Sequence, residues 1–265
     1  MAEEEVVVER DGVIGVVTIN RPHVHNALNA QTLRGIADAI ESLSASGAVG
    51  AIVITGAGDR AFSAGADLDE LSGLDAHQAH AVLEAGQRIL AGIEHNPVPV
   101  VAAVNGVALG GGFELVLSSS FPVLSTRASF GLPESGLGLI PGYGGTQRLP
   151  RAVGPAVAAH LMLTGARLSA ERAYALGLSP LAPVKPADLL AAATGVAREI
   201  AARGPRAHAA ILRVLRAGAP AAAELALETA LAAIATAGPE AAEGIAAFKD
   251  RRKASFEPLP IRNGR

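Results

Sequence analysis

Apolar positions in the N-terminal part of the chain follow two spacings. Short continuous apolar runs predict buried strands, and apolar residues recurring every three or four positions predict helices. Strands are expected over residues 6–8, 13–19, 51–55 and 99–104, and helices over residues 30–43 and 76–94. Asp11-Gly12, between the first two strands, suits a hairpin turn. The alternation predicts an α/β core with mostly buried, near-parallel strands.

The pattern changes after about residue 185. From residue 186 to 255 no strand is expected, and alanine-rich helical segments are separated by glycine and proline. We therefore predict a core with the functional site over residues 1–190 and a helical oligomerisation region over residues 191–265. Because these helices carry few charges, some of their apolar faces are expected to pack on another subunit.

Composition narrows the class of protein. Half of the 265 residues are hydrophobic and 18% are charged, which favours a sizeable folded core over disorder. The net charge of −3 argues against nucleic-acid binding, and glycines interrupt the most apolar stretch, residues 97–113, which argues against a membrane span. Without cysteine there is no disulfide, thiolate metal site or cysteine nucleophile. Residues 1–5 are acidic and lack the apolar region of a signal peptide, so we expect a cytoplasmic protein.

Glycine gathers in three segments, residues 56–65, 106–112 and 136–145. None matches the phosphate-loop pattern, and none is a clean G-x-G-x-x-G between a strand and a helix. The second segment opens a helix expected over residues 113–118. The first ends where Asp67 and Glu70 resemble a capping box, so a helix should begin there too. Two glycine-rich helix starts can place two N–H donors on one carbonyl oxygen, which would form an oxyanion hole.

Two glutamates accompany these loops. Glu114 lies among apolar residues just inside the helix opened by the glycines, where a glutamate without a function is costly to bury. Glu134 follows Pro133 immediately before the third glycine-rich segment, and few other charges are near it. Most glutamates are solvated surface groups, but these surroundings make both residues candidates for acid/base chemistry.

Six motifs follow one another along nearly the whole chain. They are NRP (20–22) with NAL (26–28), AFSAGADL (61–68), NGVALGGGFEL (105–115), FGLPESGLGLIPGYGGTQRL (130–149), LTGARLSAERAYALGL (163–178) and EGIAAFKDRRKASF (243–256). In content and order they resemble the signatures of the enoyl-CoA hydratase/isomerase, or crotonase, family. That family's fold is a spiral of ββα turns with a C-terminal helical trimerisation region. The resemblance therefore implies this α/β fold and a homotrimer or dimer of trimers.

The resemblance also implies roles for the loop residues. The backbone N–H groups of Ala66 and Gly111 would hold the thioester oxygen of an acyl-CoA substrate. Glu134 would protonate Cα, and Glu114 would activate water. Because members with other activities often lack one glutamate, the pair favours an enoyl-CoA hydratase, which adds water reversibly to a 2-enoyl-CoA to give a 3-hydroxyacyl-CoA. No metal is implied, and no cofactor besides the coenzyme A of the substrate.

Further residues are expected to contact the acyl group or coenzyme A. They are His25, Ala27, Leu28, Ala64, Asp67, Leu68, Gly110, Pro133, Gly142, Phe248 and Arg251. The alternative for the basic run that begins at Arg251 is a solvated helix end, where cations favour the helix dipole. His23 with His25 is interpreted as a turn pair rather than a metal site. Ser63 and Thr146 lack a partnered base, so both are expected to be structural.

Three departures from the family pattern affect the substrate. SSSFP (118–122) stands where an aspartate is usual, so a buried polar contact must be remade there. Ser135-Gly136 replaces bulkier residues after Glu134, and Tyr143 and Phe113 add bulk. The chemistry is unaffected, whereas the preferred acyl chain is left open.

Two alternatives to hydration remain at this point. One is another acyl-CoA reaction on the same scaffold, namely 3,2-enoyl-CoA isomerisation, decarboxylation or hydrolysis. The other is a protein that binds acyl-CoA without turning it over. Nucleic acids and membranes are not expected as partners.

Overall fold

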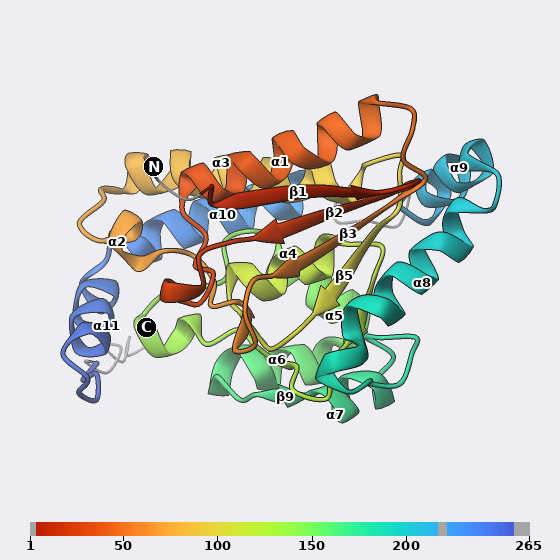
Figure 1. The fold of residues 1–265 in the computed structure, drawn as a ribbon. Coiled ribbons are helices and arrows are strands. Elements are labelled where there is room, and N and C mark those ends of the chain that lie inside the picture. The colour runs from red at the N-terminus through yellow and green to blue at the C-terminus, as the bar shows by residue number, and fades with distance from the viewer. Residues whose placement is uncertain (1–3, 217–221, 257–265) are drawn as a thin grey trace.

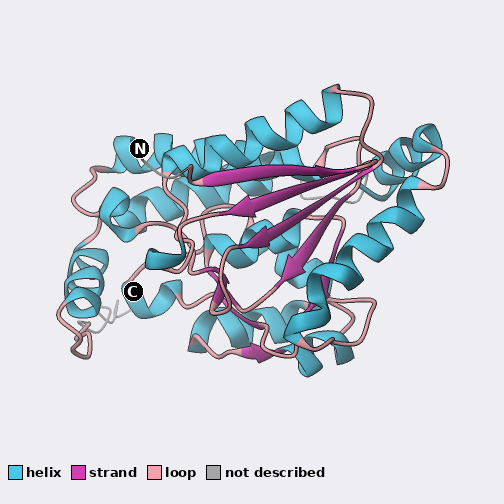
Figure 2. Cartoon of the chain, in the orientation of Figure 1, coloured by secondary structure: helices cyan, strands magenta, loops and turns pink. Residues whose placement is uncertain are grey.

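The computed structural model describes residues 4–216 and 222–256. In these residues a five-stranded sheet has the order β1-β2-β3-β5-β7 and a four-stranded sheet the order β4-β6-β8-β9 (Figures 1 and 2). The strands are β1 (Val6–Asp11), β2 (Ile14–Ile19), β3 (Ala51–Gly56), β4 (Ala61–Ser63), β5 (Val100–Val104), β6 (Val107–Leu109), β7 (Phe121–Leu124), β8 (Ser129–Gly131) and β9 (Leu168–Ser169).

Helices lie between and around these strands. The α-helices are α1 (Ala30–Ala45), α2 (Leu68–Leu71), α3 (Ala76–Glu94), α4 (Gly111–Ser118), α5 (Gly145–Val153), α6 (Pro155–Thr164), α7 (Ala170–Ala175), α8 (Leu189–Ala201), α9 (Pro205–Leu215), α10 (Ala222–Thr236) and α11 (Pro239–Lys249). The described part of the chain also has the 3₁₀ helices η1 (Pro22–Val24), η2 (Glu134–Leu137) and η3 (Pro186–Asp188).

The predicted α/β core is confirmed. β1 and β2 form an antiparallel hairpin whose turn contains Gly12 at φ 61°, a conformation that glycine adopts without strain. From β2 onward the large sheet is parallel through β3, β5 and β7. The predicted strands over residues 51–55 and 99–104 correspond to β3 and β5.

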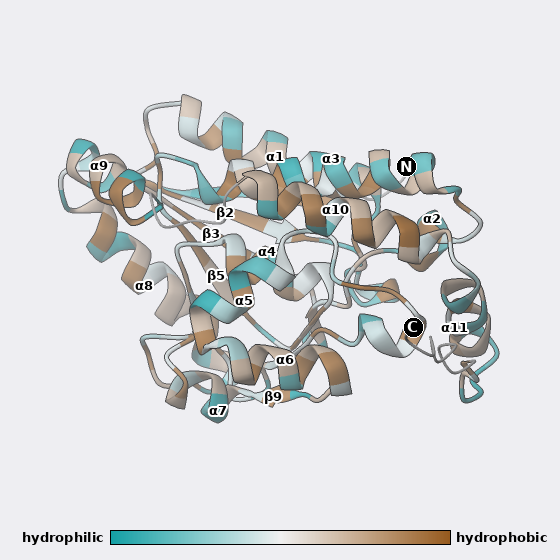
Figure 3. Ribbon diagram, turned by 180° about the vertical axis from the view of Figure 1, so that it is seen from behind, coloured by the Kyte–Doolittle hydropathy of each residue, from teal (hydrophilic) through white to brown (hydrophobic). Residues whose placement is uncertain are grey.

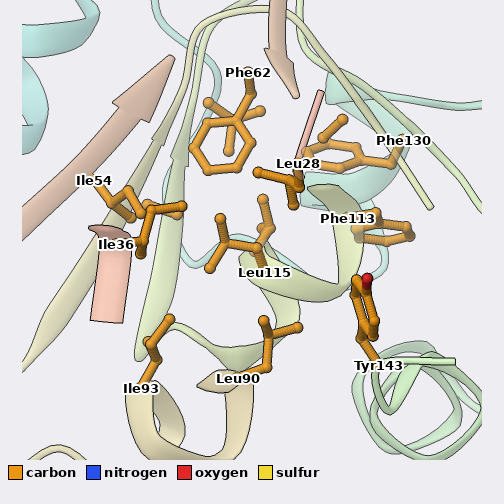
Figure 4. Close-up of a cluster of buried hydrophobic side chains, with 14 of the residues drawn as sticks. Leu28, Ile36, Ile54, Phe62, Leu90, Ile93, Phe113, Leu115, Phe130 and Tyr143 are labelled. Carbon is orange, nitrogen blue, oxygen red and sulfur yellow. The ribbon is translucent and has the colours of Figure 1, made fainter. Parts of the chain in front are cut away.

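The central strands β3 and β5 of the large sheet are buried on both faces, since successive residues of a strand point to opposite sides and nearly all of theirs are buried. Ile52 and Ile54 belong to the larger core cluster, together with residues of α1 and α3. Figure 4 shows part of this cluster around Leu28, Ile54 and Phe113. Ala51 and Val53 belong to a second cluster with buried residues of α8. The sheet therefore has helices packed against each face.

The two long predicted helices begin at capping residues. Asn29 caps α1 and accepts the Thr32 N–H at 2.7 Å. Asp75 forms a capping box with Gln78 at the start of α3, which spans the predicted residues 76–94.

The capping box predicted at Asp67 and Glu70 was wrong. Asp67 does cap α2, but its carboxylate accepts from Asp69 N at 3.3 Å. The Glu70 carboxylate instead accepts from Ala30 N at 2.8 Å, at the start of α1. The N–H of Ala30, at the start of α1, therefore takes the carboxylate that a capping box would need. α2 has only four residues.

The C-terminal helices pack on the body of this chain. α8 lies on the large sheet and α10 lies along α3 (Figure 1). No strand follows residue 186 in the described ranges 186–216 and 222–256, as the sequence predicted. The boundary at residue 190 stays a prediction, and residues 1–3, 217–221 and 257–265 of the two predicted regions lie outside the described residues. None of the helices in the described residues has both the length and the apolarity needed to cross a bilayer.

Candidate active site

The candidate residues follow the carboxyl ends of three adjacent strands of the smaller sheet. β6 is the middle strand and pairs in parallel with β4 on one side and β8 on the other. Because parallel strands end at the same edge of a sheet, the segments that leave them converge, as ligand-binding loops of α/β folds commonly do. The converging segments are residues 64–67, 110–114 and 132–134.

The first two of these segments touch through glycines. A Cβ on Gly65 would lie 2.7 Å from the Leu109 carbonyl oxygen and 3.4 Å from Gly111 N, and a Cβ on Gly111 would lie 3.4 Å from Ala66 N. The N–H groups of Ala66 and Gly111 are therefore neighbours, and no acceptor in the described residues takes a hydrogen bond from either. Gly111 also opens α4, where the helix dipole favours negative charge. This pair of free donors has the composition of an oxyanion hole.

Two motif asparagines fix the loop that leads into β4. Asn26 is fully buried, and its Nδ2 donates to the carbonyl oxygens of Ala57 at 3.0 Å and Ala61 at 2.9 Å. Asn105, after β5, donates from Nδ2 to the Gly56 carbonyl oxygen at 2.9 Å. The side-chain amides supply the donors that this irregular backbone needs, so the segment carrying Ala66 is held in place.

Glu114 lies in the first turn of α4 and its side chain is buried. Its Oε1 accepts from Tyr143 N at 2.8 Å and from Gly145 N at 2.7 Å. No donor in the described residues reaches Oε2. One oxygen is therefore fixed by the start of α5, and the other is left for a ligand or a water molecule.

Glu134 is the first residue of η2, and its carboxyl group lies beside Gly110. Its Oε2 is buried and has no hydrogen-bond partner in the described part of the chain. A Cβ on Gly110 would lie 2.9 Å from Oε1, so only glycine lets the carboxyl approach the backbone here. A buried, unpartnered oxygen is unfavourable for an ionised carboxylate and suits a protonated one.

Electrostatics couple these side chains. Burial raises the pKa of Glu134 to about 7. Burial, followed by repulsion from Glu228 and from Glu134, raises the pKa of Glu114 well above its usual range. Carboxyl groups so close together cannot all ionise at neutral pH, so they share protons, and the site can hold a proton donor beside a proton acceptor.

A pocket of about 200 Å³ connects the two glutamates with the two free N–H groups. Beyond the glutamates its wall is apolar and includes Leu71, Leu83 and Ile140. Tyr143 closes one side, and its ring packs so tightly on α3 that a Cβ on Gly86 would lie 2.3 Å from Cε1. Burial raises the pKa of Tyr143 above its ordinary value, so the phenol is neutral. The pocket thus combines polar groups for chemistry with a mainly apolar wall.

Some of the predicted substrate residues line this pocket. They are Ala64, Leu68, Gly110, Pro133, Gly142 and Phe248. Leu28 lies behind the first loop, where its N–H donates to the Gly65 carbonyl oxygen at 2.8 Å. The Ala27 carbonyl oxygen and the Asp67 carboxylate both accept from Arg21, at 2.6 and 3.3 Å.

The two predicted basic contacts to coenzyme A lie apart from the pocket lining. His25 is exposed and lines a separate hollow of about 210 Å³. Arg251 is exposed just after α11, with φ at 55°. Their roles, and that of Phe248 towards coenzyme A, stay predictions. In residues 4–216 and 222–256 no group of three or more His, Cys, Asp or Glu side chains is arranged to hold a metal ion.

The serines that depart from the family pattern remake their polar contacts locally. Ser118 and Ser119 donate to carbonyl oxygens three residues earlier in α4, at 2.8 and 2.6 Å. Ser120 accepts from Val100 N at 3.2 Å, beside the large sheet. Ser135 donates to the Met162 carbonyl oxygen at 2.7 Å, which ties η2 to α6. Phe113 does not line the pocket but packs in the core against Phe130, with ring centroids 5.0 Å apart.

Comparison with known proteins identifies the family of this chain. The profile of the enoyl-CoA hydratase/isomerase family matches residues 9–258. The chain belongs to the enoyl-CoA hydratase/isomerase family. The family membership predicted from the motifs is therefore confirmed.

Three relatives illustrate the similarity. A crotonyl-CoA hydratase of Syntrophomonas wolfei is 38% identical over 262 residues, which cover 97% of this chain and 99% of the relative. A short-chain-enoyl-CoA hydratase of Clostridium acetobutylicum is 39% identical over 205 residues, or 77% of this chain and 78% of the relative. The crystal structure of an enoyl-CoA hydratase from Mycobacterium avium subsp. paratuberculosis superimposes with a TM-score of 0.86 at 30% identity, covering 96% of this chain and 99% of that one. The crotonase fold expected from the sequence is thus confirmed.

Sequence reasoning missed one charged residue of the site, Glu228 on α10. It is 3% exposed and lies beside the turn between Tyr143 and Thr146. A signal was present, because Glu228 shares a helix face with the small residues Ala232 and Thr236, while the leucines at 227 and 231 are exposed. A glutamate on the buried side of a helix requires hydrogen-bond partners in the fold.

Proposed function

We propose that this protein is an enoyl-CoA hydratase that adds water reversibly to a 2-enoyl-CoA and yields a 3-hydroxyacyl-CoA. The observation that carries the proposal is the placing of two buried glutamates, Glu114 and Glu134, in one pocket with the free N–H groups of Ala66 and Gly111. A reaction that transfers one proton to carbon and removes another from water needs a donor and an acceptor together.

The proposed reaction begins with the thioester oxygen between the two N–H groups. Glu114, as the carboxylate, takes a proton from water while the water oxygen forms a bond to Cβ. The electron pair of the carbon–carbon double bond moves towards Cα, and the charge that develops on the thioester oxygen is stabilised by Ala66 and Gly111. Glu134 then gives its proton to Cα. One water is added, no electrons are transferred, and proton exchange returns the pair to its starting state.

Burial favours the protonated form of both glutamates, and the difference in their hydrogen bonds supports the assignment of their roles. The fixed Oε1 of Glu114 orients that carboxylate, and its Oε2 is left for the water. Glu134 has no donor to stabilise its charge at Oε2, which favours the protonated form required of an acid. Because hydration transfers no electrons, we expect no cofactor besides the coenzyme A carried by the substrate.

A short acyl chain fits the pocket best. The pocket is small, at about 200 Å³, and the side chains of Tyr143 and Leu83 line it. Leu83 packs so closely on Gly142 that a Cβ there would lie 2.6 Å from Leu83 Cδ2. The names of two relatives, crotonyl-CoA hydratase and short-chain-enoyl-CoA hydratase, agree with this choice. We therefore propose crotonyl-CoA or a 2-enoyl-CoA of similar length as the substrate.

We also propose a homotrimer or a dimer of trimers. Exposed apolar residues lie along α9 and α10, where parts of the ribbon in Figure 3 are brown, the colour of hydrophobic residues. They include Ile211, Val214, Leu215, Leu227, Leu231 and Ile234, each at least 50% exposed. Gathered apolar side chains of this kind support contact with further copies of the chain. A cytoplasmic location is proposed because the chain has no cysteine and therefore no disulfide, the bond that is characteristic of secreted proteins.

The test is to mix the protein with crotonyl-CoA and follow both the absorbance of the conjugated thioester and the mass of the product. Loss of absorbance with a gain of one water is expected. If crotonyl-CoA is not hydrated, isomerisation of a 3-enoyl-CoA at unchanged mass, loss of carbon dioxide from a carboxylated acyl-CoA, release of free coenzyme A from a saturated acyl-CoA, or binding without turnover would each replace the proposal with that alternative. Glu114→Gln and Glu134→Gln should each slow the reaction, whereas Glu41→Gln, which changes an exposed carboxylate of α1 outside the pocket, should not.

A further inference from the structure

Glu228 makes a set of contacts that the proposed reaction does not explain. It comes from α10, and its carboxylate accepts hydrogen bonds from three groups of one turn: Gly144 N, Thr146 N at 2.8 Å and the Thr146 hydroxyl. Gln87 of α3 adds a fourth hydrogen bond through Nε2, at 3.2 Å. Each carboxylate oxygen therefore accepts two hydrogen bonds from a buried surrounding.

The same turn is held from its other side by Glu114. Gly145 N donates to Glu114 at 2.7 Å, whereas the N–H groups immediately before and after it, of Gly144 and Thr146, donate to Glu228. Gly144 makes this division possible, since its φ is 101° and a Cβ would lie 2.0 Å from Arg148 Nη1. Successive N–H groups at the start of α5 thus point alternately to two carboxylates.

We propose that Glu228 is a positioning residue, which clamps the Gly144–Thr146 turn so that Glu114 is held in the orientation needed to act on water. The inference rests on the proposed hydration, and Glu228 itself does not line the pocket. If the turn lost its contacts to Glu228 and moved, the N–H groups of Tyr143 and Gly145, which fix Glu114 Oε1, would move with it. A carboxylate that has lost its orientation loses the benefit of proximity, even where substrate still binds.

Charge gives Glu228 a second effect on the same pair. The ionisable groups that face it are Glu114 from α4 and Glu134 from η2, and its charge raises the pKa of both. On α5, Arg148 is bonded to Glu94 and to the Tyr143 carbonyl oxygen, and on α10 Glu224 pairs with Arg151. Burial raises the pKa of Glu228 itself, whereas its four hydrogen bonds favour the ionised form, and in that form Glu228 helps the pair to keep a shared proton towards higher pH.

Three substitutions separate geometry from charge. Glu228→Gln removes the charge but keeps one acceptor oxygen, Glu228→Asp keeps the charge but shortens the reach, and Thr146→Val removes only the hydroxyl donor. The quantities to measure are kcat and KM for crotonyl-CoA hydration from pH 5 to pH 9. The Kd of butyryl-CoA, a saturated thioester that cannot be hydrated, reports binding alone. Glu41→Gln on the surface of α1 is the matched control.

We expect Glu228→Asp and Thr146→Val to lower kcat by about tenfold or more while the Kd of butyryl-CoA changes less than about threefold. Glu228→Gln should lower kcat as well and move the alkaline limb of the pH profile down by roughly one unit, because a neighbouring negative charge is lost. Glu228→Asp should leave that limb in place. If Glu228→Gln does not fold, Thr146→Val and Glu228→Asp decide the question.

The outcome distinguishes this inference from the proposed function. A wild-type protein that hydrates crotonyl-CoA, with variants that keep both its kcat and its pH profile, would overturn the role of Glu228 alone. Loss of butyryl-CoA binding in parallel with kcat would also overturn it, since that is the result of general damage to the pocket. A wild-type protein that does not hydrate any 2-enoyl-CoA would overturn the proposed function first.

Discussion

Replacing Glu134 by glutamine should make the protein more stable at high pH. Burial shifts the pKa of this carboxyl from 4.5 to about 7 in the folded chain. The folded state therefore binds its proton more tightly than the unfolded state does. The contribution of Glu134 to the free energy of unfolding is fully present below pH 4.5, decreases as the pH rises towards 7 and is lost above it. The full shift corresponds to about 3 kcal/mol, of which about 2.5 kcal/mol develops between pH 5 and pH 8.

Glutamine cannot ionise, so Glu134→Gln removes this pH-dependent loss. The free energy of unfolding is measured in urea at pH 5 and pH 8, at fixed protein concentration. Its decrease between these pH values should be about 2.5 kcal/mol smaller in the variant than in the wild type. Glu41→Gln, with an exposed carboxylate, should follow the wild type. Equal pH dependence in Glu134→Gln and the wild type would refute the argument that Glu134 is held protonated by burial, and with it the reason for assigning it the acid role.

Two further predictions concern the pocket. Gly145→Ala should lower kcat for crotonyl-CoA by about tenfold to a hundredfold, because its Cβ would lie 2.8 Å from Glu114 Oε1 and displace the carboxylate. Gly92→Ala, where a Cβ meets no atom within 4 Å, should keep the wild-type rate, and equal rates in both variants would contradict the prediction. Tyr143→Ala should raise kcat/KM for a 2-octenoyl-CoA relative to crotonyl-CoA by about tenfold, since it removes a large side chain from the wall of the pocket. The exposed Tyr174→Ala is its control, and an unchanged preference would show that other residues limit the chain.

Much of the architecture could be predicted because its signals are local. The helix over residues 76–94 has a strong apolar period, and Asp75 with Gln78 marks its start. The central strands β3 and β5 of the large sheet are mainly apolar runs of six and five residues. The smaller sheet was missed because β4, β6 and β8 have three residues each, too few for a period to be recognised. These short strands nevertheless position the candidate site.

The same distinction applies within the site. Glycine-rich loops beside Glu114 and Glu134 are visible in the sequence, since each loop is adjacent to its glutamate. Glu228 lies more than eighty residues from the turn it holds, so its role depends on how α10 packs, which no local pattern records. The capping box predicted at Asp67 and Glu70 failed for the same reason, because the Glu70 carboxylate binds the start of a distant helix.

The central claim is that Glu114 and Glu134 act together on one thioester, and a comparison of kcat/KM for crotonyl-CoA hydration tests it most directly. The wild type, Glu114→Gln, Glu134→Gln and the double variant are measured under one set of conditions. Each single substitution is expected to lower the rate by about 10²- to 10⁴-fold. The double variant should be about as slow as the slower single variant, because residues that act as a unit are not additive. Rates close to the wild type in either single variant would contradict the claim.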